Sequence, residues 1–149
     1  MDSITLRQAS PSLITELTRL VQAYYRYDSL VYDVSVERAI ADLVNDTRFG
    51  NAWLIEIDGD IGGYLILTAA FDIEFGGSHG IVTDFFLEER HRGRGVGLRI
   101  MSLVEDEARR LGYRAIELSV TKSNFRARKL YDRVGFVGLN DRDAMVKRL

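Results

Sequence analysis

Hydrophobic positions recur along this chain with two different periods, and their order predicts alternating groups of strands and helices. Alternating or continuous apolar runs predict strands at residues 4–8, 52–57, 61–69, 80–87, 115–120 and 144–149. Apolar residues at three- and four-residue spacing predict helices across residues 13–24, 36–44, 96–111 and 127–134. We expect residues 71–79 to form a loop. The resulting order, β-α-α-β-β-β-α-β-α-β, is typical of an α/β protein with a mixed sheet and helices on its faces.

Short polar motifs predict where these elements begin and end. Serines before helical patterns are expected N-caps, and a proline is expected at a first helical position. An Asp-Gly pair predicts a tight hairpin turn, and glycines mark a bulge within a strand or the end of a helix. The residues concerned are Ser10, Pro11, Ser35 and Ser123 for helix starts, Asp58-Gly59 for the turn, Gly62 and Gly63 for the bulge, and Gly112 and Gly135 for helix ends.

Composition narrows the class of protein. The 149 residues fit a single domain over residues 1–149, and a net charge of −2 provides no basic field for nucleic acid. The chain has no cysteine, which removes disulfides and thiolate nucleophiles, and its two histidines, His79 and His91, lack metal-ligand spacing. The first residues lack a basic secretory leader, and no run approaches the roughly 20 apolar residues of a membrane span. We therefore expect a cytoplasmic protein without a bound metal or a membrane partner.

A glycine-rich, basic segment lies between a predicted strand and a predicted helix. Residues 90–97 read Arg-His-Arg-Gly-Arg-Gly-Val-Gly. A helix start offers unsatisfied amides and a positive dipole end, glycines let phosphate oxygens approach the backbone, and Arg92 and Arg94 add charge. Neither the Gly-Lys-Ser/Thr of a Walker loop nor the third glycine of a Rossmann fingerprint is present. The segment predicts a pyrophosphate site of a different kind.

Three segments together carry a family resemblance. Arg92-x-x-Gly95-x-Gly97 follows the strand residues Asp84-Phe85-Phe86-Leu87 and precedes Asn124…Ala127…Leu130-Tyr131…Gly135-Phe136. In this order and spacing they resemble the GNAT N-acetyltransferase superfamily over nearly the whole chain. The resemblance implies a GNAT-type fold with splayed central strands. It also implies acetyl-CoA as cosubstrate and direct transfer of acetyl to an amine.

The resemblance also implies which residues hold acetyl-CoA. The backbone of the strand before the loop would pair with the pantetheine arm, the amides of the loop would bind the pyrophosphate, and Asn124 would lie near the pantetheine. The strand side chains can pack in the core while their backbone binds. The implied strand and loop residues are Phe85, Phe86, Leu87, Arg92, Gly93, Arg94, Gly95, Val96, Gly97 and Leu98.

The resemblance indicates one residue for the catalytic acid but leaves several candidates for the catalytic base. Tyr131 matches the family tyrosine that protonates the departing sulfur, although a tyrosine packed between helix and sheet is the alternative. Asp84 is the candidate base, but polyamine acetyltransferases of the superfamily have a glutamate just before this aspartate, where this chain has Thr83. Because alternate strand residues point to opposite faces, we do not expect Asp84 to replace a carboxylate at position 83. Glu74, His79 and a water molecule are further candidates for the base. A structural role, such as accepting backbone N–H bonds, is the alternative for Asp84.

The acceptor is expected near the end of the first helix. Aromatic rings and carboxylates there suit a cation, and the residues are Tyr24, Tyr25, Tyr27, Asp28, Tyr32 and Asp33. Of these, Tyr25 and Asp28, together with Glu74, are the predicted acceptor contacts, and a small cationic amine is the predicted acceptor. A protein N-terminus or lysine is the alternative acceptor, and a non-catalytic acetyl-CoA-binding module is the alternative function. The resemblance also implies a homodimer.

Overall fold

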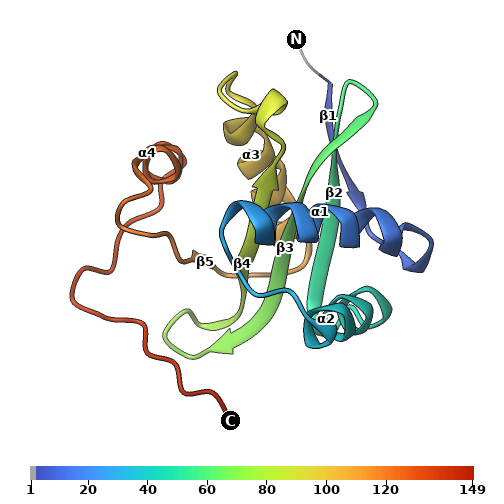
Figure 1. The fold of residues 1–149 in the computed structure, drawn as a ribbon. Helices are drawn as coiled ribbons and strands as arrows, with labels where there is room; N and C mark the ends of the chain where they lie inside the picture. The colour runs from blue at the N-terminus through green and yellow to red at the C-terminus, as the bar shows by residue number, and fades with distance from the viewer. Residues whose placement is uncertain (1–2) are drawn as a thin grey trace. The chain divides into compact units, whose positions relative to one another are not determined.

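A five-stranded sheet organises the first of the two units in the computed structural model, which describes residues 3–149. This unit ends at Ser119, and the second unit runs from Val120 to Leu149. The strands lie in the order β1-β2-β3-β4-β5 (Figure 1). Their bounds are Ile4–Gln8, Gly50–Ile57, Asp60–Asp72, Gly77–Leu87 and Ile116–Leu118. The first four are antiparallel to their neighbours and β5 is parallel to β4, which confirms the predicted mixed sheet.

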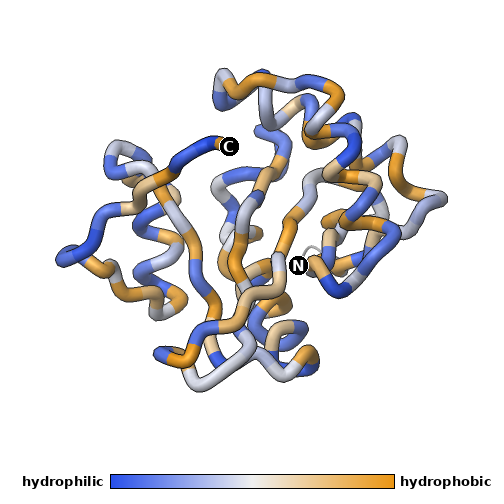
Figure 2. The backbone as a smooth tube through the Cα atoms, turned by 90° about the horizontal axis from the view of Figure 1, so that it is seen from below, coloured by the Kyte–Doolittle hydropathy of each residue, from blue (hydrophilic) through white to orange (hydrophobic). Residues whose placement is uncertain are grey.

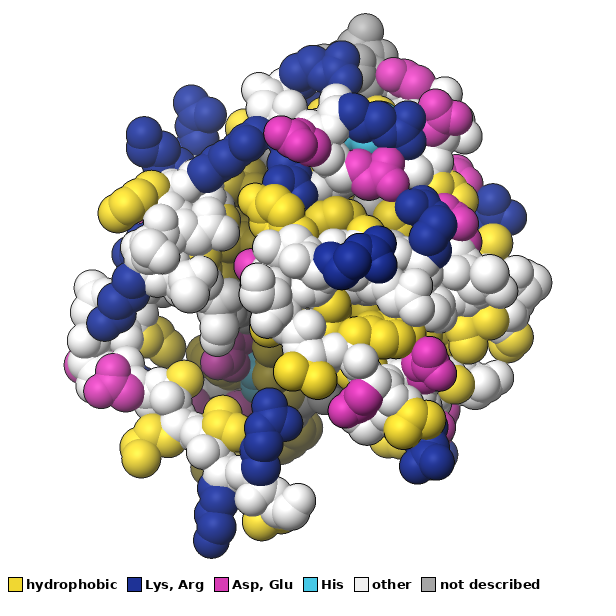
Figure 3. Space-filling model, in the orientation of Figure 1, with side chains coloured by type: hydrophobic (Ala, Val, Ile, Leu, Met, Phe, Trp, Pro, Cys, Tyr) yellow, Lys and Arg dark blue, Asp and Glu magenta, His cyan; other side chains and the backbone are white. Residues whose placement is uncertain are grey.

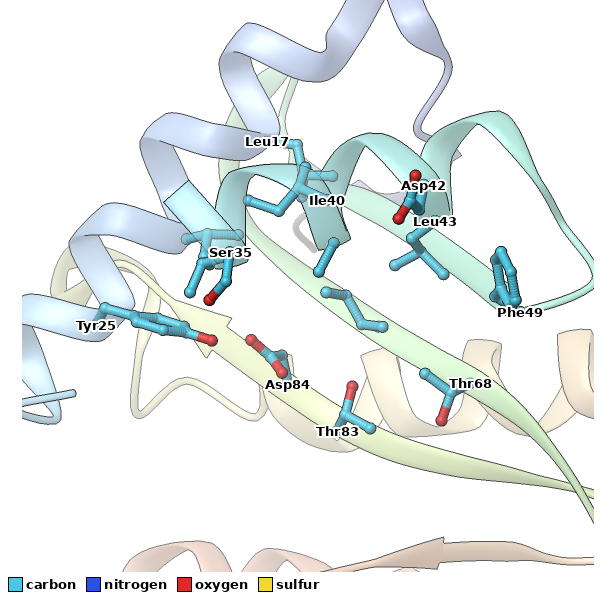
Figure 4. Close-up of a pocket in the computed structure, with 14 residues that line it drawn as sticks. Leu17, Tyr25, Ser35, Ile40, Asp42, Leu43, Phe49, Thr68, Thr83 and Asp84 are labelled. Atoms are coloured by element: carbon cyan, nitrogen blue, oxygen red, sulfur yellow. The ribbon is translucent and has the colours of Figure 1, made fainter. Parts of the chain in front are cut away.

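Helices cover both faces of this sheet. The helices α1 and α2 lie on one face and α3 lies on the other (Figures 1 and 4). Their bounds are Ile14–Tyr27, Val34–Asn45 and Val96–Arg110, and the second unit contains α4, Phe125–Arg133. Short 3₁₀ turns at Pro11–Leu13 and Glu89–His91 precede α1 and α3.

The core explains why the central strands read as continuous apolar runs. A strand covered on both faces buries successive residues, and β2 is buried along almost its whole length. Leu54 and Tyr64 join a hydrophobic cluster with Leu17 and Leu20 of α1, and all four side chains are fully buried. Figure 2 shows hydrophobic stretches along the central strands and mixed positions along the helices.

Two predicted features of the strands are confirmed. Asp58 and Gly59 both have positive φ, 53° and 87°, as a tight hairpin turn of the primed type requires. The pairing of β2 with β3 shifts between Ile55 and Glu56 so that Gly62 is an extra residue. Gly62 is also where the backbone approaches a side chain, since an added Cβ would lie 2.4 Å from the ring of His91.

Other predicted boundaries are wrong, and each has a local reason. Asp33 rather than Ser35 caps α2, because its carboxylate accepts from the amides of Ser35 and Val36. Asn124 rather than Ser123 caps α4 through the amide of Ala127. Aspartate and asparagine are as good as serine at this position, so composition did not discriminate.

The loop predicted at residues 71–79 is instead the tip of a long hairpin. The strand β3 continues to Asp72 and β4 already begins at Gly77, because the exposed polar and glycine residues still pair across the strands. The strand predicted at 115–120 is limited to Ile116–Leu118. The strand predicted at 144–149 is absent, since no other segment of residues 3–149 pairs with it. An extended segment becomes a strand only when a partner receives its backbone hydrogen bonds.

Candidate active site

The strand β4 separates from β5 at a bulge. On one side, Ile66 pairs with Asp84 but the next residue of β3 pairs with Val82, so Thr83 is an extra residue. On the other side, pairing of β4 with β5 ends where Val82 meets Leu118. Among residues 3–149, the last part of β4 therefore has one backbone edge without a strand partner, a geometry that bulges commonly introduce. This edge is the splayed arrangement expected from the sequence, and it can accept an extended ligand as an added strand does.

The loop after β4 presents unused backbone amides. Gly93 and Gly95 have positive φ, 91° and 76°, and Gly95 is the N-cap of α3 without a side-chain cap. Within the described part of the chain, the amides of residues 93–97 donate to no acceptor, whereas the amide of Leu98 donates to the carbonyl of Gly95 at 3.1 Å. A Cβ added at Gly95 would meet nothing within 4 Å. The space in front of these amides can thus hold an anion.

A pocket of about 480 Å³ lies between the sheet and the helices α1 and α2. Figure 4 shows the carboxylate of Asp84 and the hydroxyls of Tyr25 and Thr83 directed into it. The pocket lining includes both Thr83 and Asp84, so the expectation that they point to opposite faces is wrong. The extra residue of the bulge interrupts the alternation and turns both side chains to the same side.

A buried tyrosine holds the carboxylate of Asp84. The hydroxyl of Tyr64, a fully buried residue, donates to Oδ2 of Asp84 at 2.7 Å. Burial raises the pKa of Asp84, and the hydrogen bonds from Tyr64 and Thr83 act in the opposite direction. A carboxyl group with a raised pKa inside a pocket is a candidate for proton transfer.

Comparisons with known proteins agree with this geometry. Residues 14–136 match the model of the acetyltransferase (GNAT) family. The chain belongs to the GNAT acetyltransferase family. It is 32% identical over 92 residues to an uncharacterized N-acetyltransferase, YycN, of Bacillus subtilis (strain 168). That match covers 61% of this chain and 58% of the relative, so the chain spans little more than half of the relative's length.

Solved structures with the same fold accompany this family match. An integron cassette protein from the mobile metagenome of Cole Harbour Salt Marsh has a TM-score of 0.83 and 28% identity, covering 97% of this chain and 90% of that one. A predicted acetyltransferase from Clostridium acetobutylicum, solved with acetyl-CoA, has a TM-score of 0.77 and 16% identity, covering 97% and 96%. The second likeness shows the fold alone.

In this GNAT protein both loop arginines make contacts within the chain. Nε of Arg92 donates to the carbonyl of Leu87 at 2.7 Å, and its guanidinium lies 4.4 Å from the ring centroid of Tyr27. Arg92 therefore connects the end of β4 to the end of α1. Arg94 donates to the carbonyl of Arg90 at 3.2 Å and remains exposed. Both guanidinium groups are thus used within the chain, and their predicted contacts with acetyl-CoA stay predictions.

The strand residues predicted to hold pantetheine pack their side chains against the protein, and their backbone role stays a prediction. Phe86 and Leu87 are buried, and Phe86 packs against the ring of Tyr24 at 5.8 Å between centroids. Phe85 is half-buried. Their side chains pack while one backbone edge beyond the bulge pairs with no strand of the described residues.

Several predicted acceptor or base residues lie outside the pocket lining. Asp28 accepts from the hydroxyl of Tyr24 at 3.3 Å at the exposed end of α1, and Asp33 is occupied as a helix cap. Glu74 lies exposed at the tip of the β3–β4 hairpin. His79 is buried, with Nε2 3.4 Å from Oε2 of Glu117, and does not line the pocket. Of the predicted acceptor contacts, the structure brings only Tyr25 beside Asp84 (Figure 4).

Sequence reasoning missed Tyr64. In the sequence, Tyr64 is one apolar position of the strand predicted at residues 61–69. The available signal was its hydroxyl, because a tyrosine in a buried strand usually has a hydrogen-bond partner. The partner depends on the register between β3 and β4, which the bulge shifts.

The second unit holds the remaining two predicted residues. Tyr131 of α4 is half-buried, with its ring 5.6 Å from that of Phe136, and burial raises its pKa. Oδ1 of Asn124 accepts from the amide of Ala127 at 3.1 Å. This bond assigns the Asn124 side chain to capping, and the roles of both residues toward acetyl-CoA stay predictions.

Residues 3–149 contain no group of three or more His, Cys, Asp or Glu side chains that could hold a metal ion. None of the helices in the same residues is long and apolar enough to cross a membrane.

Proposed function

We propose that this protein transfers an acetyl group from acetyl-CoA directly to the primary amine of a small cationic acceptor. One observation carries the proposal. The unpaired backbone edge of β4 is followed along the chain by the unused amides of residues 93–97. An extended pantetheine arm followed by a pyrophosphate has the chemistry that these two features accept. The resemblance to an N-acetyltransferase of Bacillus subtilis supports the same reading.

The pocket supplies the groups that an amine needs. An alkyl ammonium has a pKa of about 10.4, so it must lose a proton before its nitrogen can attack the thioester carbon. Asp84 accepts that proton, directly or through a water molecule. An amide N–H of Phe85 or Phe86 then stabilises the oxyanion that develops on the acetyl oxygen.

Release of coenzyme A completes the transfer. As the tetrahedral intermediate collapses, the carbon–sulfur bond breaks, the nitrogen releases its second proton to water, and the thiolate takes a proton. Tyr131 is the proposed donor, because a tyrosine hydroxyl, with an ordinary pKa of about 10, is protonated at neutral pH. The products are the N-acetyl amine and free coenzyme A. The absence of cysteine from the chain is consistent with direct transfer.

Two measurements test the proposed function. Calorimetric titration with acetyl-CoA measures binding, and a thiol reagent follows amine-dependent release of coenzyme A. Because the chain has no cysteine, the protein itself gives no signal with this reagent. We expect binding, and release that depends on amine. Binding without release across a broad amine panel would instead favour an acetyl-CoA-binding module, an alternative that Thr83 in place of a glutamate supports. Preferred acetylation of peptide amines would favour a protein acetyltransferase.

Replacing Tyr131 by phenylalanine removes the proposed proton donor. We expect kcat to fall by about 10²-fold, in the range of general acid catalysis, with little change in the Kd for acetyl-CoA. Steady-state kinetics and calorimetry on the same preparation separate the two. If kcat of the variant equals that of the wild type, Tyr131 has only a structural role, in packing against Phe136.

Replacing Tyr64 by phenylalanine tests a positioning role. The change removes the hydroxyl that donates to Asp84, which lowers the pKa of this carboxyl in the wild type. We expect the pKa of Asp84 to rise further, so the acidic limb of the kcat/KM profile should move to higher pH while activity at high pH is largely kept. A uniform loss at every pH would contradict this role.

A further inference from the structure

The pocket beside Asp84 has one charged end and a long apolar wall. Figure 4 shows Tyr25 and Asp84 at one end and Phe49 at the other. Ile40 and Leu43 of α2 line the wall between them. On this face of the molecule, Figure 3 shows hydrophobic side chains visible between α1 and α2. A ligand that extends from Asp84 toward Phe49 would therefore contact polar groups mainly with the end that lies beside Asp84.

The hydroxyls along the wall are already used within the protein. The hydroxyl of Thr68 donates to the carbonyl of Ile81 at 3.3 Å, and that of Ser35 donates to Asp33 at 2.5 Å. The polar groups left to contact a ligand therefore gather around Asp84. Farther along, a ligand would find no unused hydroxyl on the wall, whereas apolar groups of the ligand would cover its apolar side chains.

The charges of the pocket limit how many cationic groups a ligand can carry. Its lining contains no lysine, arginine or histidine, and its carboxylates are Asp84 and Asp42. Asp42 is exposed, and Figure 4 shows it on α2, across the pocket from Asp84 on β4. Asp84 is thus the counter-charge beside the reacting end. Farther along, a second cation would meet the apolar surfaces of Leu43 and Phe49 and, at most, the solvent-exposed Asp42, where an ion pair contributes little.

We propose that the acceptor is a primary monoamine with an apolar body, aliphatic or aromatic, whose amino group lies beside Asp84 and whose body extends toward Leu43 and Phe49. This proposal rests on the proposed N-acetyltransferase function and names the chemical class of its acceptor. A volume of about 480 Å³ is enough for a small ligand of this kind. Polyamines and aminoglycosides, which carry several charges or hydroxyls, match the wall poorly.

A homologous series of linear primary amines, from propylamine to octylamine, gives the first test. If each added methylene is buried against the wall, kcat/KM should rise about fourfold per carbon until the pocket is full. Phenylalkylamines should then exceed spermidine and an aminoglycoside by about tenfold or more at equal concentration. Release of coenzyme A is followed at saturating acetyl-CoA.

A variant pair gives the second test. Ala39 lines the pocket from an exposed position of α2, so Ala39→Asp adds a carboxylate to the wall without disturbing the core. We expect KM for octylamine to rise about tenfold and the relative kcat/KM for spermidine to increase. The control, Asn45→Asp, adds the same charge to an exposed position of α2 outside the pocket, and it should leave both unchanged. It also removes the hydrogen bond from Nδ2 of Asn45 to the carbonyl of Ala41 at 2.8 Å, so thermal denaturation of both variants checks the fold.

The outcomes separate this proposal from the proposed function. A flat alkylamine series, or faster acetylation of spermidine, the aminoglycoside or a peptide amine, would overturn the monoamine acceptor while leaving N-acetyl transfer intact. No release of coenzyme A with any amine would overturn both. Equal effects of Ala39→Asp and Asn45→Asp would show that the acceptor does not lie along this wall.

Discussion

Substituting Gly95 by aspartate should weaken the binding of acetyl-CoA by between about tenfold and 100-fold while the fold is kept. The new side chain would enter open space, since a Cβ there meets no atom within 4 Å. Its carboxylate would stand before the amides proposed to bind the pyrophosphate, so two anions would compete for the same donors. Charge-assisted hydrogen bonds of this kind contribute about 1.5–3 kcal/mol each, which sets the range.

A matched variant separates charge from backbone strain. Gly95 has a left-handed φ of 76°, and aspartate and asparagine both tolerate this conformation better than most residues. Gly95→Asn therefore has the same shape and similar strain but no charge. We expect its Kd for acetyl-CoA to lie much closer to that of the wild type. Calorimetry gives Kd, and thermal denaturation checks the fold. An unchanged Kd in Gly95→Asp would remove this loop from the site.

Substituting Asp84 by asparagine should lower kcat by about 10²- to 10⁴-fold, the usual contribution of a general base. Asparagine keeps the shape, and its carbonyl oxygen can still accept from the hydroxyl of Tyr64. The loss should therefore report the missing proton acceptor. In the wild type, kcat/KM should rise with pH as Asp84 ionises, at a pH above the usual carboxyl range because burial raises its pKa. In the variant, the rise of kcat/KM that reports ionisation of Asp84 should disappear, whereas the rise that reports deprotonation of the amine substrate should remain.

The same variant has an opposite effect on stability. Between the ordinary pKa of a carboxyl and the raised pKa of Asp84, the folded protein holds a proton that the unfolded chain has released. The free energy of unfolding therefore decreases as pH rises through this range, and the wild type does not regain it at neutral pH. We expect Asp84→Asn to unfold at an equal or higher temperature than the wild type at pH 7. A variant that is both inactive and clearly less stable would assign Asp84 a structural role instead.

Much of the fold could be predicted from local pattern. The turn at Asp58-Gly59 and the extra residue at Gly62 follow from the conformations that glycine and aspartate adopt, and the structure has both. The order of the helices followed from spacing, whereas a cap was misplaced wherever two polar residues of equal propensity stood close together, as Asp33 and Ser35 do. The strand expected at residues 144–149 failed because a strand needs a partner that its own sequence does not contain.

The loop around Gly95 and the family that it indicates were determined by the sequence itself, because glycine spacing and helix-start chemistry are local properties of the chain. The surroundings of Asp84 were decided only by the tertiary structure. A bulge at Thr83 depends on pairing with β3, the hydrogen bond from Tyr64 depends on the resulting register, and the apolar wall depends on how α2 packs over the sheet. These are contacts between segments far apart in the chain, so no single segment encodes them.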